Sequence, residues 1–111
     1  MDVRRLRVLR EVADRGTVAA AAAALSTTPS AVSQQLKVLT REAGVPLLEP
    51  DGRRLRLTAA GRALLPHVDE VLSALDRAVA EMESFSETLR GTVRVALFPS
   101  GAALLLPRVL H

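Results

Sequence analysis

Hydrogen-bonding and basic side chains gather on one side of residues 28–43, a stretch whose spacing fits an amphipathic helix. The polar side chains on that side are Ser30, Ser33, Gln34, Lys37 and Arg41. Hydroxyl, amide and cationic groups of this length suit hydrogen bonds to base edges and phosphates, and no carboxylate joins them before Glu42. Two interpretations fit this face: a helix that lies in a DNA major groove, or an ordinary helix with a solvated polar side.

Both ends of this helix are marked in the sequence. Thr28 can cap the first turn with its hydroxyl, and Pro29 suits the first helical position, where no amide donor is needed. Gly44 can close the other end in a left-handed conformation. The apolar residues that would face a core recur at steps of four, three and four: Val32, Leu36, Leu39 and Ala43.

Two further helices are predicted upstream. Residues 3–13 carry an apolar stripe at helical spacing, and Gly16 ends that helix. Residues 18–25 are nearly all Ala, the best helix former, whose small side chain lets helix backbones approach closely. Because only a short turn at Ser26 separates them from the next helix, the pattern is a helix-turn-helix, which favours the DNA interpretation. A helical spacer is the alternative for the Ala run.

A basic hairpin is predicted directly downstream. Residues 50–52, Pro-Asp-Gly, are a strong turn signal, and residues 53–57 then alternate between basic and apolar. Arg54 and Arg56 would point outward while the leucines between them face the core. A hairpin with a basic tip beside a helix-turn-helix is typical of a wing, whose arginines contact phosphates or enter the minor groove. An edge strand protected by charge is the alternative.

The apolar pattern then continues as one long helical segment. Six apolar residues recur at steps of three and four, which makes a heptad seam: Leu65, Val68, Leu72, Leu75, Val79 and Met82. A helix this long cannot pack its whole stripe on so small a domain, so we expect a second copy of the chain to cover it. Packing within one chain is the alternative. Pro66 removes one backbone hydrogen bond, which predicts a kink or a boundary between two helices.

The last residues predict different elements. Residues 89–91 end the helix, and residues 92–98 are apolar and β-branched enough for a buried strand. Residues 99–101 make a turn, and residues 102–110 would begin a helix that Pro107 interrupts. Because one strand and a partial helix cannot form a domain, we expect this tail to be the first piece of something larger.

Composition narrows the classes of function. The chain has 111 residues, with 15 Lys and Arg against 12 Asp and Glu. Residues 1–57 hold ten of the basic residues and six of the acidic ones, and this excess of positive charge suits a polyanionic partner. Cysteine is absent, so disulfides and thiolate metal sites are excluded. No apolar run approaches the ~20 residues of a membrane span, and no signal peptide is evident, so we expect a cytoplasmic protein. We also expect no bound metal. His67 and His111 have no paired carboxylate or phosphate loop nearby, so we assign no catalytic residue and expect no enzyme.

The order and spacing of these residues resemble the N-terminal part of LysR-type transcriptional regulators. The matching residues are Leu6, Ala13, Gly16, Thr17, Ala21, Ala22, Leu25, Ala31, Val32, Ser33, Leu36 and Leu39, then residues 44–49, 52–54, 57–58 and 60–61. The chain departs from the common pattern at residues 28–30, Gln34, Leu48 and Pro50, where the family commonly has Ser-Gln-Pro, Arg, Phe and Arg.

The resemblance implies a mainly α fold with three parts. Residues 1–58 would be a winged helix-turn-helix, residues 59–90 a linker and dimerisation helix, and residues 91–111 the first strand and partial helix of a truncated effector-binding domain. The heptad residues named above would form the dimer. A helical protein-interaction adaptor that acts through its coiled-coil helix is the alternative function.

The resemblance also implies sequence-specific binding of double-stranded DNA, by a homodimer on an interrupted inverted repeat. The residues that it assigns to the DNA are Thr28, Pro29, Ser30, Ser33, Gln34, Lys37 and Arg53, of which Pro29, Ser30, Ser33 and Gln34 would lie at base edges. Arg54 joins these residues as an arginine of the basic hairpin. No cofactor is expected in this chain. A small-molecule effector, and any oligomer beyond the dimer, would belong to a full-length protein.

Overall fold

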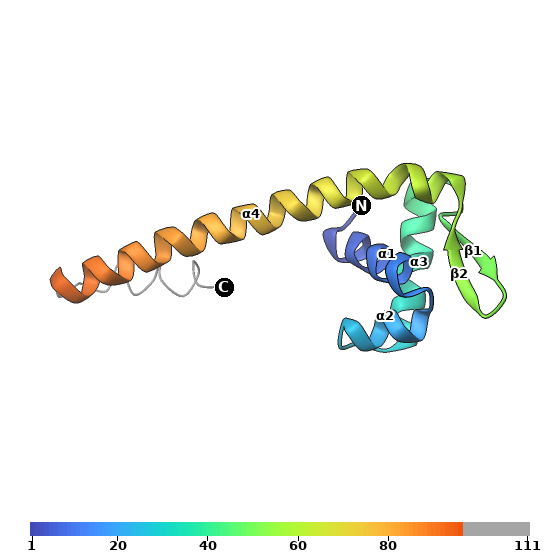
Figure 1. Ribbon diagram of the computed structural model, residues 1–111, viewed down its shortest axis with the longest axis horizontal. Coiled ribbons are helices and arrows are strands. Elements are labelled where there is room, and N and C mark those ends of the chain that lie inside the picture. The colour runs from blue at the N-terminus through green and yellow to red at the C-terminus, as the bar shows by residue number, and fades with distance from the viewer. Residues whose placement is uncertain (97–111) are drawn as a thin grey trace. The chain divides into compact units, whose positions relative to one another are not determined.

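Four helices and one hairpin make up the part of the chain that the structure, a computed structural model, describes: the backbone of residues 1–96 and the side chains through residue 88. In chain order the elements are α1 (Val3–Arg15), α2 (Val18–Ala24), α3 (Pro29–Ala43), β1 (Leu48–Asp51), β2 (Arg54–Leu57) and α4 (Ala59–Ala96) (Figure 1). The predicted fold class, a mainly α winged helix-turn-helix followed by a long helix, is confirmed. Residues 1–72 form one compact unit, and α4 continues into a second.

The helix α3 forms as its sequence predicts. The hydroxyl oxygen of Thr28 accepts a hydrogen bond from the amide of Ala31 at 3.1 Å, and Pro29 occupies the first helical position. At the other end Gly44 has φ of +79° and its amide donates to the carbonyl oxygen of Thr40 at 2.9 Å. A left-handed conformation of this kind favours glycine, so both ends of α3 are fixed by local sequence.

The Ala-rich helix α2 packs closely against α1 and α3. Its Ala21 and Ala22 are buried in one apolar cluster with Val8, Val12 and Val32. Small side chains at these positions let the three helix backbones approach one another closely. The turn before α3 contains Ser26 with φ of +54°, a left-handed conformation that is uncommon for a residue other than glycine. This packing holds α3 at a fixed angle to α1.

A second apolar cluster joins the start of α4 to the same helices. It consists of Leu6, Leu9, Leu39, Leu47 and Val68, with Leu65 and Leu72 packed against it. An ion pair of 3.2 Å between Arg10 and Asp69 adds a polar contact between α1 and α4. The first part of the long helix therefore belongs to the core of the N-terminal unit.

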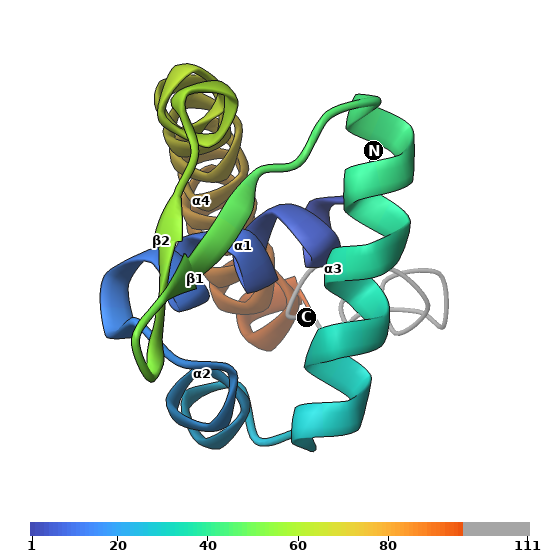
Figure 2. The ribbon, with the colours of Figure 1, turned by 90° about the vertical axis from the view of Figure 1, so that its right-hand side faces the viewer.

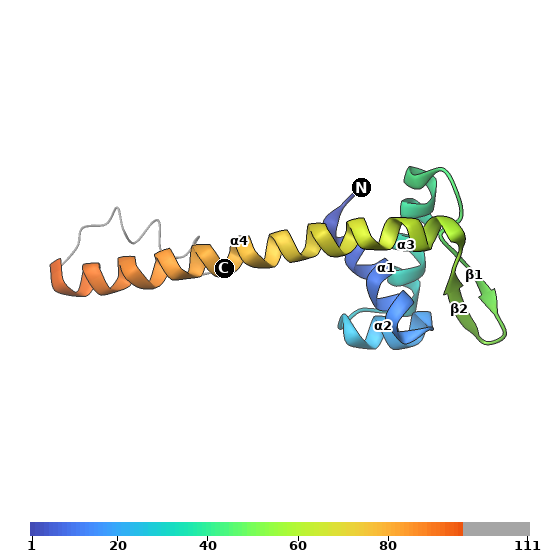
Figure 3. The same ribbon diagram turned by 45° about the horizontal axis from the view of Figure 1, so that its top comes forward.

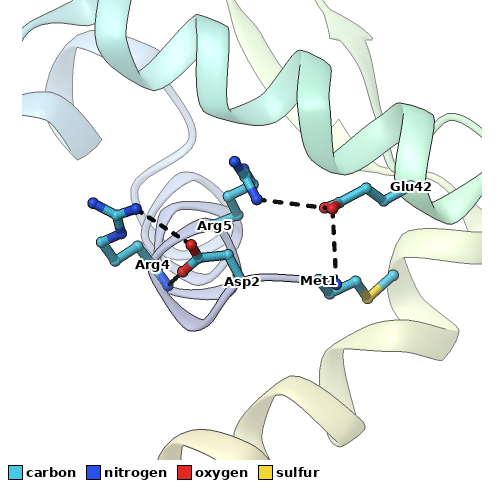
Figure 4. A network of polar contacts seen from close by, with 5 residues as sticks. All are labelled: Met1, Asp2, Arg4, Arg5 and Glu42. Carbon is cyan, nitrogen blue, oxygen red and sulfur yellow. Dashed lines mark hydrogen bonds and ion pairs between the residues drawn. The ribbon is translucent and has the colours of Figure 1, made fainter.

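Polar contacts also connect the start of α1 to the last turn of α3 (Figure 4). The carboxylate of Glu42 lies 3.8 Å from both the guanidinium of Arg5 and the amino group of Met1. Asp2 caps α1, and its hydrogen bonds with the amide and guanidinium of Arg4 hold the pKa of Asp2 below its usual value. Partly exposed pairs of this length stabilise a fold only slightly, so the two apolar clusters dominate.

The predicted hairpin is present, with one correction to its boundaries. Asp51 and Arg54 form the last pair of the antiparallel register, so the turn is Gly52 and Arg53 instead of residues 50–52. Pro50 therefore lies within β1, opposite Leu55. The amide of Leu55 donates to the carbonyl oxygen of Gly16 at 2.8 Å, so Leu55 and Pro50 do not exchange backbone hydrogen bonds between the strands. Proline, which has no amide hydrogen, can therefore occupy this position without the loss of a hydrogen bond.

One junction connects the base of the hairpin to the start of α4. The amide of Thr58 donates to the carbonyl oxygen of Leu47 at 3.0 Å. The hydroxyl of Thr58 donates to the carbonyl oxygen of Pro46 at 2.7 Å. The same hydroxyl oxygen accepts from the amide of Gly61 at 3.1 Å and so caps α4. Gly61 packs against this loop so tightly that a Cβ would overlap the carbonyl oxygen of Leu47.

We therefore expect Gly61→Ala to lower the free energy of unfolding by about 1 to 3 kcal/mol, because a rigid backbone oxygen has to move to admit one methyl group. Urea unfolding followed by circular dichroism measures this change. Helix propensity alone predicts the opposite sign, since alanine is a better helix former than glycine. A variant as stable as the parent chain would show that the junction adapts freely.

The predicted end of the long helix was wrong. Residues 92–96, expected to begin a strand, continue α4, and the helix does not stop at Gly91. An isolated strand leaves its amides and carbonyls unpaired, whereas a helix pairs them within the segment, so helix formation wins over β propensity here. Pro66 also lies within one continuous helix, so it marks no boundary between two helices (Figure 1). The turn and partial helix predicted for residues 99–110 lie outside the described residues.

Candidate nucleic-acid interface

The polar face predicted for α3 is a continuous exposed stripe. Ser30, Gln34, Lys37 and Arg41 follow one another at steps of four, three and four, and all four are exposed. Thr28 and Pro29 are exposed at the start of the helix, whereas Ser33 is half-buried at the edge of the stripe. The sequence thus predicted correctly which side of the helix is exposed.

A groove of about 590 Å³ runs between this side of α3 and the hairpin. Figure 2 shows the two elements that form its walls, with α3 on one side and the hairpin on the other. The lining residues are Gln34, Leu36, Lys37, Thr40, Arg41, Pro46, Leu48 and Leu55. Leucines and proline provide apolar surface, while amide, hydroxyl and cationic groups come from the stripe of α3. No carboxylate lines the groove.

Lys37 and Arg41 are the cations of this groove. Among the described side chains neither has a hydrogen bond or an ion pair, so both are available to an anion from outside. Sequence analysis placed Arg41 on the polar face but did not include it among the DNA contacts. Its spacing of four residues from Lys37 is the signal that points to it.

The three arginines of the hairpin occupy different environments. Arg56 pairs across the strands with Glu49 at 2.8 Å, and this hydrogen bond raises the pKa of Arg56. Arg54 donates to the carbonyl oxygen of Arg15, at the end of α1, over 3.3 Å. Arg53 is exposed in the turn and pairs with no described side chain. Arg53 is therefore the cation that the hairpin tip presents to a partner.

The start of α3 and the hairpin tip lie at the same end of the N-terminal unit. Figures 1, 2 and 3 place the tip at the end of the unit where α2 lies, away from the first turn of α4, and Figure 2 shows the start of α3 at the same end. The cations of the groove lie further along α3, with Arg41 in its last turn. The unit can therefore contact a polyanion at three places: the start of α3, the groove and the hairpin tip.

The opposite side of α3 carries a smaller cavity of about 230 Å³. Its lining residues are Arg4, Arg7, Val8, Leu25, Thr27, Ala31, Val32 and Gln35. Gln34 and Gln35 are therefore adjacent in sequence but line cavities on different sides of the helix, which makes them a matched pair for experiments.

The predicted heptad seam is divided between two environments. Val68 is only 1% exposed, and Leu65 and Leu72 are partly buried against the core of the same chain. Packing within one chain, which the sequence left open, therefore accounts for these three residues. Along the rest of α4 the large apolar side chains are 38–57% exposed, at steps of four, four, three and three: Val71, Leu75, Val79, Met82 and Phe85. We call these five residues the apolar stripe of α4; sequence analysis missed its first and last members.

The described residues hold no metal cluster and no membrane span. No three His, Asp or Glu side chains among them come together as metal ligands. None of the helices in this range is long and apolar enough to cross a membrane. His67 is exposed on α4. The groove and the apolar stripe of α4 remain the features that call for a partner.

Comparison with known proteins agrees with this geometry. The family model described as "Bacterial regulatory helix-turn-helix protein, lysR family" matches residues 3–62, which include the helix-turn-helix and the hairpin. A probable hydrogen peroxide-inducible genes activator from Mycobacterium xenopi is 41% identical over 105 residues, which cover 95% of this chain and 56% of that protein. The transcriptional dual regulator GltC from Bacillus subtilis (strain 168) is 38% identical over 110 residues, covering 99% of this chain and 37% of that protein. The chain thus spans about half or less of the length of these two relatives.

Solved structures give the same result. The crystal structure of a CbnR DBD–DNA complex superposes with a TM-score of 0.70 at 33% sequence identity, covering 76% of this chain and 97% of that chain. The matched family model covers more than half of the 111 residues. The chain therefore belongs to the LysR family of bacterial regulatory helix-turn-helix proteins.

Proposed function

We propose that this chain is the DNA-binding part of a transcriptional regulator and reads double-stranded DNA in a sequence-specific manner. The observation that carries this proposal is the groove between α3 and the hairpin, which combines Lys37 and Arg41 without a carboxylate. The CbnR DBD, which resembles this chain in fold, was crystallised in a complex with DNA. This function would also keep the protein with the chromosome, in the cytoplasm.

The dimensions of B-DNA suit the two elements at this end of the unit. A major groove about 12 Å wide admits one α-helix, so the start of α3 would meet base edges through Pro29, Ser30, Ser33 and Gln34. The strand backbone that borders the major groove would pass over Lys37 and Arg41. The hairpin tip would then reach the adjacent minor groove with Arg53. Thr28, at the helix start, would lie beside a phosphate.

We further infer that two copies of the chain act together, through the apolar stripe of α4. Five exposed apolar side chains along one face of a helix suit burial against an identical face. A dimer of this kind would bring two α3 helices to successive major grooves, about 34 Å apart, and would select an interrupted inverted repeat. A small-molecule effector would belong to a full-length protein, beyond the described residues.

The same stripe would also suit a helical adaptor that binds another protein and no DNA. A titration of labelled duplex against unlabelled competitor DNA, at several salt concentrations, separates the two functions. We expect saturable binding whose affinity falls steeply with salt, because bound phosphates release counterions. Oligomerisation without saturable duplex binding would favour the adaptor.

Gln34 provides the sharpest test of base reading. A glutamine can make two hydrogen bonds to adenine, so Gln34→Ala should cost about 1 to 3 kcal/mol at its preferred base pair and relax preference there. Binding-site selection with each variant measures this change. Gln35→Ala is the matched control, because Gln35 lines the cavity on the other side of α3. If both variants kept the parent preference, Gln34 would have no role in reading bases.

A further inference from the structure

The hairpin is attached to the end of α1 by two hydrogen bonds. The amide of Leu55 donates to the carbonyl oxygen of Gly16 at 2.8 Å, and the guanidinium of Arg54 donates to the carbonyl oxygen of Arg15 at 3.3 Å. These acceptors lie at the C-terminal end of a helix, where unsatisfied carbonyls attract a cation. The contacts join segments that are 39 residues apart in the chain.

The guanidinium of Arg54 also lies in space that only a glycine leaves free. Gly16 has φ of +85°, and a Cβ on this residue would overlap the guanidinium of Arg54. The side chain of Arg54 therefore covers the backbone of Gly16 directly. Neighbouring Arg53 lacks any such contact among the described residues, and Arg56 pairs with Glu49 within the hairpin.

Contacts of this kind matter because the hairpin is short. Its strands have four residues each, and Leu48, Leu55 and Leu57 pack against the two apolar clusters. Residues 51–54 at the tip have no apolar side chain that could do the same. The hydrogen bond from Thr58 to Leu47 fixes the base of the hairpin. Arg54 belongs to the pair next to the turn, with Asp51, so its contact with α1 acts near the tip.

We propose that Arg54 is a positioning residue, which clamps the hairpin to the end of α1 over Gly16 and so aims Arg53 at the DNA without touching the DNA itself. The part of this inference that concerns DNA rests on the proposed function. It replaces the direct contact with DNA that the basic hairpin pattern predicts for Arg54. Loss of the clamp would let the tip rotate about its fixed base. The contact of Arg53 with the DNA would weaken, although Arg54 itself binds no phosphate.

The DNA arm of the test compares Arg54→Ala with Arg53→Ala. A lost phosphate contact lowers the slope of log affinity against log salt by about 0.9, so Arg53→Ala should show that decrease. Because Arg54 acts through the contact of Arg53, we expect Arg54→Ala to lower the slope by no more than Arg53→Ala does, and the double variant to lower it by about 0.9 as well. Arg54→Ala should also lose protection of the base pairs under the hairpin in footprinting. Arg54→Lys should restore part of that protection, because an ammonium can still donate one bond to the carbonyl oxygen of Arg15. A double variant whose slope falls by about 1.8, as two separate phosphate contacts would give, would overturn the proposal.

A second arm needs no DNA and stays valid if the proposed function fails. Hydrogen exchange of the Leu55 amide reports directly on the attachment of the hairpin to Gly16. We expect exchange of this amide to be about tenfold faster in Arg54→Ala and unchanged in Arg53→Ala, with the core amides of α3 protected in both. Equal protection of Leu55 in the two variants would show that the clamp does not hold the hairpin. Absence of duplex binding by the parent chain, with faster exchange in Arg54→Ala, would reject only the DNA function.

Discussion

Glutamine in place of both Leu75 and Met82 is expected to separate the proposed dimer into monomers and to lower the affinity for an inverted repeat by at least about 100-fold. Both side chains belong to the apolar stripe of α4 and are exposed in the single chain. In a dimer the second half-site is bound intramolecularly, and that gain disappears when the two chains separate. Glutamine keeps the charge and the helix propensity of the segment, so the change acts on the interface.

Sedimentation velocity measures the oligomeric state of this variant, and fluorescence anisotropy measures its affinity for the duplex. Ser73→Gln combined with Ala80→Gln is the matched control, because both residues are exposed on α4 outside the stripe. Leu72, a member of the predicted seam, is a poor target because it packs against the core of its own chain. A double variant that sediments as an unchanged dimer would place the interface elsewhere.

The second large effect is expected in the groove between α3 and the hairpin. Lys37→Gln combined with Arg41→Gln should lower the slope of log affinity against log salt by about 1.8, since each cation neutralises one phosphate. The corresponding loss of affinity is about 10- to 100-fold at ~0.1 M salt, and it should be similar for all DNA sequences because phosphates carry no sequence information.

A variant with the same kind of charge change outside the groove provides the control. Arg77 is exposed on α4, in the second unit, so Arg77→Gln should leave the slope close to that of the parent chain. Comparison of Arg41→Gln alone with Arg77→Gln isolates the residue that sequence analysis did not assign. If the two single variants gave equal slopes, net charge would explain the effect and the groove would not.

Local signals in the sequence were sufficient to predict α3 and its polar side. Thr28, Pro29 and Gly44 determine where the helix begins and ends through bonds within a few residues, and the apolar spacing determines which side is buried. The alternation of Arg and Leu likewise predicted which side of β2 faces outward. Such features depend on chemistry between near neighbours, which a sequence displays directly.

Features that depend on distant contacts could not be predicted in the same way. Nothing near Arg54 indicates that its guanidinium meets the carbonyl oxygen of Arg15, because that contact requires the folded arrangement of α1 and the hairpin. The heptad spacing is identical at Val68 and Leu75, yet one is buried in its own chain and the other is exposed. The spacing of apolar residues predicts that one face of the helix packs against something. Whether that partner is the same chain or another one depends on the tertiary structure.

Selection of bound sites from a random duplex library by the parent chain tests the DNA-reading function most directly. We predict enrichment of an interrupted inverted repeat, with half-site centres about one helical turn, 10 to 10.5 base pairs, or a multiple of it apart. Failure to enrich any sequence over the starting library, at salt concentrations where the folded chain remains dimeric, would contradict sequence-specific DNA binding by α3 and the hairpin.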